Sequence, residues 1–385
     1  MMQRSRHIFA TCLFSALCAV NAACHADSDT GVLRGAGPAY PGVVPGETLV
    51  FPRDHGAHPD FRTEWWYITG WLRDEADVER GFQLTFFRVR PRIAEGGSSR
   101  FSPNQLLLAH AAVADPARGR LLHAERAERS LPPLAGAGEA HTDVRIRDWS
   151  LAWSEAPGVA GAYHARVGAG EFAFDLELRP EGAPVLNGQG GYSRKAPDPK
   201  HASYYYSRPH LKVSGHLSAG HDAHRVTGAA WLDHEWSSEI MPDDARGWDW
   251  IGVNLDDGGA LMAFRMRGEK GEPIWSAATL READGSLRTF QQDEISFVPT
   301  REWRSPRSGT VYPVAWSLHL AGAGNAPVRT FRIVPLMDDQ ELDSRASTGA
   351  IYWEGAVRLF DDGTEPQEIG KGYLEMTGYA DRLEM

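Results

Sequence analysis

Cysteine is almost absent from this sequence, and its few copies lie at one end. The chain has 385 residues and three cysteines, Cys12, Cys18 and Cys24, all within the first 24 positions. Everything after Cys24 therefore has neither a disulfide nor a thiol nucleophile, even if the protein reaches an oxidising compartment. Its stability has to come from apolar cores, and a chain of this length usually divides them between two domains.

A long apolar run is also missing. The longest one, residues 8–20, is shorter than the roughly 20 residues that a membrane-spanning helix needs. It follows Arg4 and Arg6 and precedes small residues, which predicts a signal peptide over residues 1–26 and a periplasmic or secreted protein. As an alternative, the segment ending at Cys24 resembles an imperfect lipoprotein box, and lipidation there is the one membrane contact that we expect.

Basic residues are fewer than acidic ones, and several common catalytic motifs are absent. The predicted leader holds two of the 40 Lys and Arg and none of the 51 Asp and Glu, so the rest of the chain has a formal net charge of −13. Such a surface repels phosphate backbones, and we expect no nucleic-acid partner. The sequence contains no Gly-x-Ser-x-Gly and no Gly-x-x-x-x-Gly-Lys motif, which excludes the usual serine hydrolases and nucleotide-binding loops. We expect no cofactor.

What the chain does have is aromatic residues in strand-like runs. Its 13 tryptophans point to aromatic surfaces around a small hydrophobic ligand. Residues 64–72 and 81–89 alternate with a period of two across a charged turn, which predicts a hairpin. Similar runs follow in two series, at residues 105–114, 148–154, 163–167, 171–178 and 210–217, and then at 250–255, 260–266, 274–280, 294–298, 314–320, 330–335, 352–359 and 370–376.

Many short strands at regular spacing without a long helix predict an all-β chain in which each half is a sandwich or a barrel, and closure into a barrel is the common way to remove exposed strand edges. A barrel of about eight strands can hold one small ligand. We expect an extended lead-in over residues 27–46, a first domain over residues 47–222 and a second over residues 223–385. The strand pattern is also diluted at residues 242–246, which is an alternative boundary.

Two segments concentrate chemically versatile side chains. Residues 54–67 contain two histidines, three carboxylates and an arginine beside aromatic residues, and residues 231–236 read Trp-Leu-Asp-His-Glu-Trp. The candidate catalytic residues are Asp233, Glu235 and Glu64, and the candidate ligand-binding residues are Trp65, Trp66, Tyr206, Trp231, Trp236, His55, His58 and His234.

Several long stretches resemble one known family. DHGAHPDFRTEWWYITGWL, GQGGYSRK, SYYYSRPHL, AAWLDHEWSS and GWDWIGVNLDDGGALMAFRMRG are similar to the AttH family of secreted lipocalin-like proteins, which is related to the carotenoid 1,2-hydratases. The resemblance implies two lipocalin-like (calycin) antiparallel β-barrel domains in tandem, an apolar isoprenoid or lipid-like ligand, and an ABC transporter permease system as partner. It also implies an alternative function as a hydro-lyase, because Asp233 matches the proposed acid of the hydratases.

The hydratase chemistry makes specific demands on the residues around Asp233. Water addition to an alkene needs a protonated acid, and an apolar aromatic pocket raises the pKa of a carboxyl while ring faces stabilise the cation. Strand alternation places Trp231, Asp233 and Glu235 on one face and His234 and Trp236 on the other, so the two groups cannot enter one barrel. Trp65 and Trp66 must likewise point in opposite directions, one of them toward a cavity.

Other interpretations of these residues stay open. Asp233, His234 and Glu235 form a cluster that could close a barrel mouth against Arg62 or Arg246. Glu64 with Asp233 could form a carboxylate pair of the glycosidase type, which their separation decides. A metal on His55, His58 and Asp60 is a weak hypothesis, since two histidines on a Gly- and Pro-rich loop are a weak signal, and we expect none. The tryptophans could also be ordinary core residues.

Overall fold

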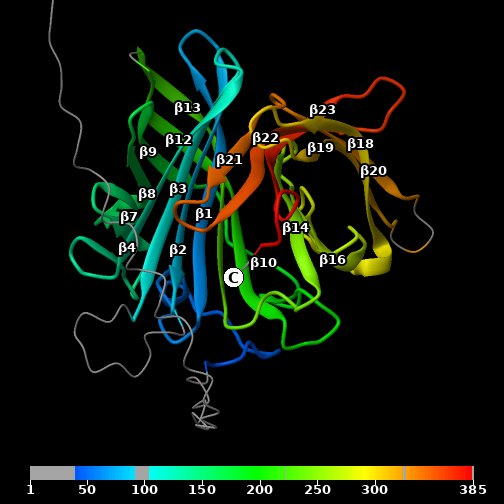
Figure 1. The fold of residues 1–385 in the computed structure, drawn as a ribbon, viewed down its shortest axis with the longest axis horizontal. Helices are drawn as coiled ribbons and strands as arrows, with labels where there is room; N and C mark the ends of the chain where they lie inside the picture. Colours follow the sequence, from blue (N-terminus) through cyan, green and yellow to red (C-terminus); the bar gives the residue numbers. More distant parts are fainter. Residues whose placement is uncertain (1–39, 92–103, 221, 323, 325–326, 384–385) are drawn as a thin grey trace, which may run out of the picture. The chain divides into compact units, whose positions relative to one another are not determined.

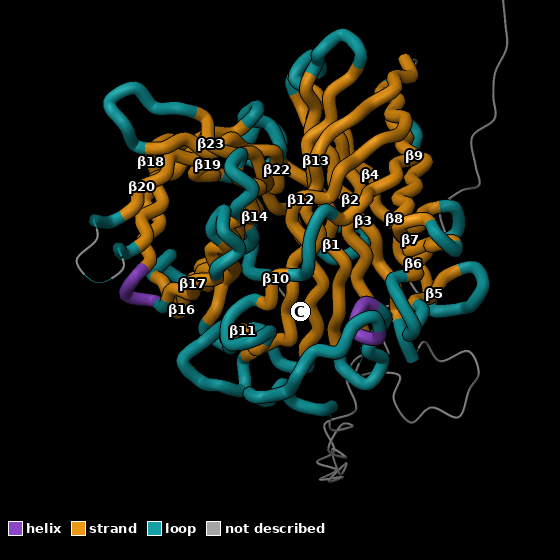
Figure 2. Tube along the Cα trace, turned by 180° about the vertical axis from the view of Figure 1, so that it is seen from behind, coloured by secondary structure: helices purple, strands orange, loops and turns teal. Residues whose placement is uncertain are grey.

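The computed structural model describes residues 40–91, 104–220, 222–322, 324 and 327–383. The predicted leader with Cys24 and residues 27–39 of the lead-in lie outside these ranges. Within them, no helix is long and apolar enough to cross a membrane. The only helical elements there are the three-residue 3-10 turns Arg53–His55 and Gln292–Glu294, and strands make up the rest of the regular structure (Figure 2).

The first sheet runs in the order β4-β3-β2-β1-β13-β12-β9-β8-β7-β6-β5, with β10 and β11 paired to β12, and is coloured blue to green in Figure 1. Neighbouring strands are antiparallel throughout. Its strands are β1 (Thr63–Asp74), β2 (Glu79–Val89), β3 (Leu106–Asp115), β4 (Arg120–Arg129), β5 (Ala135–Ala137), β6 (Asp143–Ile146), β7 (Trp149–Ala156), β8 (Val159–Gly168), β9 (Phe172–Pro180), β10 (Val185–Leu186), β11 (Tyr192–Arg194), β12 (Ala202–Ala219) and β13 (Asp222–Ser237).

The second sheet, yellow to red in Figure 1, has the order β17-β16-β15-β14-β23-β22-β20-β19-β18, with β21 paired to β22. It too is antiparallel. Its strands are β14 (Ala245–Leu255), β15 (Ala260–Gly268), β16 (Pro273–Arg281), β17 (Leu287–Phe290), β18 (Ile295–Arg304), β19 (Val311–Leu320), β20 (Arg329–Pro335), β21 (Glu341–Ser344), β22 (Ala350–Asp361) and β23 (Glu368–Met376).

Each sheet curls around its own apolar core, which confirms the predicted pair of antiparallel barrel-like bodies. The first core includes Trp66, Phe82 and Trp149, and the second is built around residues such as Trp316 and Trp353. The alternation of large apolar and other residues along each strand produces this arrangement, because every second side chain points to the inner face. The hairpin predicted from residues 64–72 and 81–89 is formed by β1 and β2.

The chain passes from one sheet to the other between Ser237 and Ala245. The predicted domain boundary after residue 222 falls instead within the β12–β13 hairpin, where β13 pairs with both β12 and β1. The change of sheet thus coincides with the alternative boundary near residues 242–246. Whether the two sheets are separable domains stays a prediction.

The two sheets contact each other through a third apolar cluster. It joins Tyr67, Trp71 and Trp231 of the first sheet to side chains of the second such as Trp250 and Phe264. Polar contacts also cross this junction: the Trp71 indole donates to the Gly372 carbonyl at 3.0 Å, and the Gln83 amide donates to Glu354 at 2.8 Å. The outer face of β1 and β13 is therefore buried as well as the inner one.

Candidate functional site

The predicted site residues separate onto the two faces of β1, β12 and β13. Glu64 and Trp66 on β1, with His234 and Trp236 on β13, point into the first barrel, where they meet His55, His58 and Tyr206. Trp65, Trp231, Asp233 and Glu235 point outward to the junction between the sheets. The alternation expected for residues 231–236 and for Trp65 and Trp66 is confirmed.

The outward group opens onto a cavity between the two sheets, which we call the junction pocket. Its space unoccupied by atoms is about 720 Å³, part of which is open to solvent. The first sheet and the adjoining segments contribute Trp65, Tyr67, Thr85, Phe87, Lys195, Asp233, Glu235 and Ile240, and the second sheet contributes Trp248, Trp250, Phe264, Met266, Tyr352, Glu354 and Glu375. Aromatic rings and carboxyl groups thus dominate its walls.

Asp233 lies at the wall of this pocket and is buried, at 3% exposure. The Tyr205 hydroxyl donates to Asp233 Oδ2 at 2.6 Å, and the Ser207 hydroxyl and the Trp231 indole donate to Oδ1, each at 2.6 Å. Burial raises the pKa of Asp233 to about 7, against the lowering effect of these three hydrogen bonds. The carboxyl therefore exchanges its proton near neutral pH, as the hydratase hypothesis requires.

Glu235, two residues along the same face, has a different environment. Lys195 Nζ lies 2.7 Å from Glu235 Oε1, and Ser203 donates to the same oxygen. The Lys195 ammonium also packs over the rings of Tyr205 and Phe264, at 4.8 and 4.4 Å from their centroids. The basic partner in this cluster is thus Lys195 and not Arg246, which pairs with Glu269.

Two further carboxyl groups line the pocket from the second sheet. Glu354 on β22 lies directly opposite Glu375 on β23. The Gln83 amide donates to Glu354 at 2.8 Å and the Trp248 indole donates to Glu375 at 3.1 Å. Burial raises the pKa of Glu354 to about 7 and that of Glu375 well above its usual value, where the neighbouring Glu354 charge adds to the effect.

Sequence reasoning missed Glu354, Glu375 and Lys195. Each glutamate interrupts an apolar strand run, in Ile-Tyr-Trp-Glu-Gly and Tyr-Leu-Glu-Met. A charged residue within such a run is a usable signal, because carboxyl groups are rarely placed in a barrel wall without a partner. Lys195 ends the family stretch GQGGYSRK and lies in the segment after β11, but nothing in that stretch predicts its pairing with Glu235.

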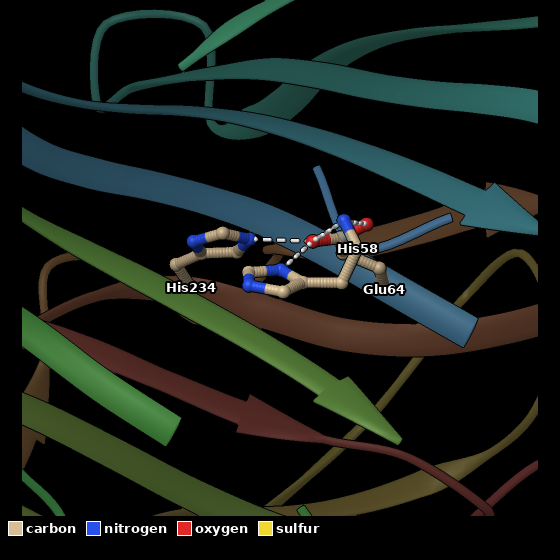
Figure 3. Close-up of side chains that lie close together, drawn as sticks. All are labelled: His58, Glu64 and His234. Carbon is tan, nitrogen blue, oxygen red and sulfur yellow. Dashed lines mark hydrogen bonds and ion pairs between the residues drawn. The ribbon is translucent and has the colours of Figure 1, made fainter. Parts of the chain in front are cut away.

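Inside the first barrel, Glu64 is the centre of a second cluster (Figure 3). His58 Nδ1 and His234 Nε2 lie 2.8 and 2.9 Å from the same oxygen, Glu64 Oε1, and Arg88 Nε donates to Oε2 at 2.8 Å. Burial alone would raise the pKa of Glu64, but the two histidines and the Arg88 charge hold it well below its usual range. Glu64 is thus a buried, ionised carboxylate.

The three side chains in Figure 3 are close enough to hold a metal ion, since their ligand atoms lie within 4.8 Å of one another. Their hydrogen bonds favour another role. His58 Nε2 also lies 3.2 Å from Asp54, and these two carboxylates raise the pKa of His58 although burial opposes it. With the Arg88 guanidinium already paired with Glu64 at 2.8 Å, a second cation beside this carboxylate is disfavoured. Asp60 has no place in this cluster.

The remaining candidates pack around these groups. His55 Nδ1 lies 2.7 Å from the Tyr206 hydroxyl, which lies 3.1 Å from His234 Nδ1. The Trp236 ring stacks on His58 at 3.7 Å and Trp66 stacks on His234 at 4.8 Å. None of these residues lines the junction pocket, and Glu64 cannot pair with Asp233 from the opposite face.

Comparison with known proteins supplies a family context. The sequence profile of the AttH-like family matches residues 42–379. The chain is 48% identical to an AttH protein of known structure from Nitrosomonas europaea, with a TM-score of 0.79 over 88% of this chain and 99% of that one. Kievitone hydratase from Nectria haematococca is similar in fold, with a TM-score of 0.67, 14% identity and coverage of 90% and 97%.

A complex of CghA with Sch210972 is also similar in fold, with a TM-score of 0.51, 13% identity and coverage of 83% of this chain and 89% of that one. At such identities these two likenesses concern the fold alone. No functionally curated protein matches the chain in sequence.

Proposed function

The chain belongs to the AttH-like family, and from this premise we propose that it is a lipocalin-like protein that binds an isoprenoid or other lipid-like molecule in the junction pocket. The observation that carries the proposal is the pocket itself. Ligand sites in proteins are typically concave and mostly apolar, with a small number of converging polar groups. The junction pocket has these properties, with aromatic walls and four carboxyl groups.

The first barrel interior is a less suitable place for the ligand. Its axis is filled by large side chains, including Trp66, Phe82, Phe86 and Tyr163, each with at most 1% of its surface exposed. A ligand there would have to displace this close-packed core, at a cost of several kcal/mol. The junction pocket is already an opening between the sheets that is partly open to solvent, so the proposal places the ligand there.

Substitution of one half-buried tryptophan tests this placement. Trp65 lines the junction pocket, while Trp303 on β18 is similarly half-buried but lies away from it. With retinol as a fluorescent isoprenoid probe, Trp65→Ala should raise the dissociation constant by about tenfold or more. Trp303→Ala should leave it unchanged. Wild-type affinity in Trp65→Ala, or equal losses in the two variants, would argue against the junction pocket.

A second candidate function is a hydro-lyase, and it is favoured by the environment of Asp233. A protonated Asp233 would transfer its proton to one alkene carbon, leaving a tertiary carbocation on the other. A water molecule would then add to that carbon and lose a proton to a pocket carboxylate such as Glu235, and a proton returning to Asp233 completes the cycle. Trp65 and Trp250 line the same pocket, where aromatic rings can stabilise the cation.

One variant distinguishes hydro-lyase activity from ligand binding alone. Asp233→Asn keeps the size of the side chain but removes the transferable proton, so ligand binding should persist while water addition stops. The measurement is mass spectrometry of an acyclic isoprenoid alcohol incubated with each protein in ¹⁸O-labelled water. Equal ¹⁸O incorporation by wild type and variant would exclude Asp233 as the proton donor, and no incorporation by wild type would leave binding as the function.

The ABC transporter partner and the exported, lipid-tethered state stay predictions from the family resemblance and the leader sequence. Both can be approached through Cys24. Mass spectrometry of the protein isolated from its native envelope should find either an acylated N-terminal Cys24, which supports a tethered accessory role, or cleavage beyond Cys24, which opposes it.

A further inference from the structure

The junction pocket has an excess of acidic over basic groups. Of its lining residues, Asp233, Glu235, Glu354 and Glu375 carry carboxyl groups and Lys195 alone carries a basic one. Lys195 already pairs with Glu235 at 2.7 Å. Three of the four carboxyl groups therefore face the pocket without a cationic partner.

The imbalance is greatest on the second sheet. Glu354 and Glu375 are direct neighbours across β22 and β23, and in the described parts of the chain neither makes an ion pair with a lysine, arginine or histidine. Their hydrogen-bond donors are the neutral Gln83 amide and Trp248 indole. Two carboxyl groups in such a position cannot both ionise unless a positive charge is brought to them.

An unfilled hydrogen-bonding position lies at the same place. Glu354 Oε1 and the Tyr67 hydroxyl are both buried and interact with each other, as Glu354 also does with Tyr352, yet neither of these two atoms completes a well-formed hydrogen bond among the described residues. Buried polar atoms without partners are rare in native proteins, and in a pocket they are commonly met by a ligand group. This observation is independent of the charge count, and it indicates that a polar group of the ligand belongs beside Glu354.

The aromatic walls suit a cation rather than an anion. The rings of Trp65, Trp248 and Trp250 line the cavity. The faces of such rings are electronegative and attract ammonium groups. The pocket already contains one such ammonium–ring contact, because the Lys195 ammonium packs 4.4 Å from the Phe264 centroid. A carboxylate or phosphate ligand would instead meet carboxyl oxygens and electronegative ring faces.

We infer that the junction pocket selects ligands in which an apolar body carries a positively charged nitrogen, with the charge held between Glu354 and Glu375 and the surrounding indole rings. The inference rests on the proposed ligand binding and adds to it the chemical class of the ligand. It excludes free fatty acids and phosphorylated isoprenoids as preferred ligands, since both bring negative charge to an acidic pocket.

Three probes with the same alkyl chain test the inference: decyltrimethylammonium, decanol and decanoate, each titrated calorimetrically into the full-length protein below its micellar concentration. The cation should bind about tenfold or more tightly than the alcohol, the factor expected from one desolvated cation–π contact together with the attraction of a nearby carboxylate. Decanoate should bind most weakly. In the double variant Glu354→Gln, Glu375→Gln the preference for the cation over the alcohol should largely disappear, while the affinity for decanol stays within about threefold.

Glu341→Gln is the matched control, because Glu341 is a buried glutamate of the second sheet that lies outside the pocket and pairs with Ser305. This variant should keep the full cation preference. Decanol binding as tightly as decyltrimethylammonium would overturn the inference and leave the proposed function standing. A cation preference that survives in the double variant would also overturn it. If none of the three probes binds, the proposed function itself fails, and the inference fails with it.

Discussion

Asp233 and His234 are consecutive in the chain but belong to hydrogen-bond systems on opposite faces of β13. Asp233 accepts a hydrogen bond from Tyr205 on the outer face of the barrel wall, whereas His234 Nε2 lies 2.9 Å from Glu64 inside the barrel. Their partners alternate in the same way, since Tyr205 faces the junction pocket and Tyr206 faces the barrel. Each face can therefore be tested without disturbing the other.

Tyr205→Phe should raise the pKa of Asp233 above its value of about 7. The Tyr205 hydroxyl donates to Asp233 Oδ2 at 2.6 Å, and loss of a donor destabilises the ionised form of a buried carboxyl. Titration of ¹³C-labelled aspartate side chains by NMR measures the change. Tyr206→Phe is the control and should leave the Asp233 resonance unaffected. An unchanged or lower pKa in Tyr205→Phe would contradict this prediction.

The stability of the protein should depend on pH through Asp233. Because its pKa is raised from 3.8 to about 7 in the folded state, the folded chain binds the proton more tightly than the unfolded chain. The contribution of this group is thus fully present below about pH 4 and is lost as the pH rises to 7, by at most about 1.4 kcal/mol per pH unit.

Urea denaturation from pH 4 to 8 tests this linkage. The free energy of unfolding of wild type minus that of Asp233→Asn should decline over the interval, while exposed Glu302→Gln should give a constant difference from wild type. Parallel curves for wild type and Asp233→Asn would show that Asp233 titrates in the same way in both states.

Glu64→Gln should destabilise the fold without changing ligand binding in the junction pocket. The substitution leaves the Arg88 guanidinium, 1% exposed, without its 2.8 Å partner, at a cost of about 3 kcal/mol. Because the pKa of Glu64 is lowered on folding, its stabilisation is present above about pH 4.5 and is lost as the pH falls. The difference between wild type and variant should therefore shrink in acid.

Chemical denaturation at pH 7 and pH 3.5 measures this difference, with exposed Glu47→Gln near the same barrel end as the control. A neutral effect of Glu64→Gln at pH 7 would mean that the Arg88 charge is compensated elsewhere. Loss of retinol binding in a folded Glu64→Gln protein would instead extend the site into the barrel.

Gly81→Ala should weaken the contact between the sheets. A Cβ at Gly81 would lie 2.5 Å from the Tyr373 hydroxyl and 2.7 Å from Ala356 Cβ, both on the second sheet. Relief of this overlap should lower the free energy of unfolding by about 1–3 kcal/mol. Gly170→Ala, which meets no atom within 4 Å, should change it by less than about 0.5 kcal/mol. Thermal unfolding of the two variants compares them directly, and equal melting temperatures would refute the predicted close approach.

Local periodicity was enough to predict an all-β chain and the split between neighbouring residues, whereas the pair of barrels was implied by the family resemblance. Trp65 and Trp66 point in opposite directions because side chains alternate along any strand, whatever surrounds it. Periodicity could not say which face of β13 was the barrel interior, since both faces are buried here and both carry polar and aromatic residues. For the same reason Glu64 and Asp233 could be considered as one carboxylate pair from the sequence, although their side chains lie on opposite faces of the sheet.

The second wall of the pocket could not be predicted from local sequence. Glu354 and Glu375 follow Asp233 by more than a hundred residues and reach it only because β22 and β23 pack against β1 and β2. Such a contact depends on tertiary packing between sheets, for which strand periodicity carries no information. Lys195 illustrates the same limit, because its ion pair with Glu235 is fixed by the path of a loop.

Because the walls of the junction pocket come from both sheets, the affinity for a ligand reports whether the two halves of the molecule are correctly assembled. Neither half alone has a complete set of walls, so a fragment ending near Ser237 would retain Asp233 and lose Glu354 and Glu375. A molecule bound there touches both halves and resists their separation, which adds its binding free energy to the cohesion between them. Ligand occupancy of the junction pocket should therefore increase the resistance of the two halves to separation, and loss of the ligand should decrease it.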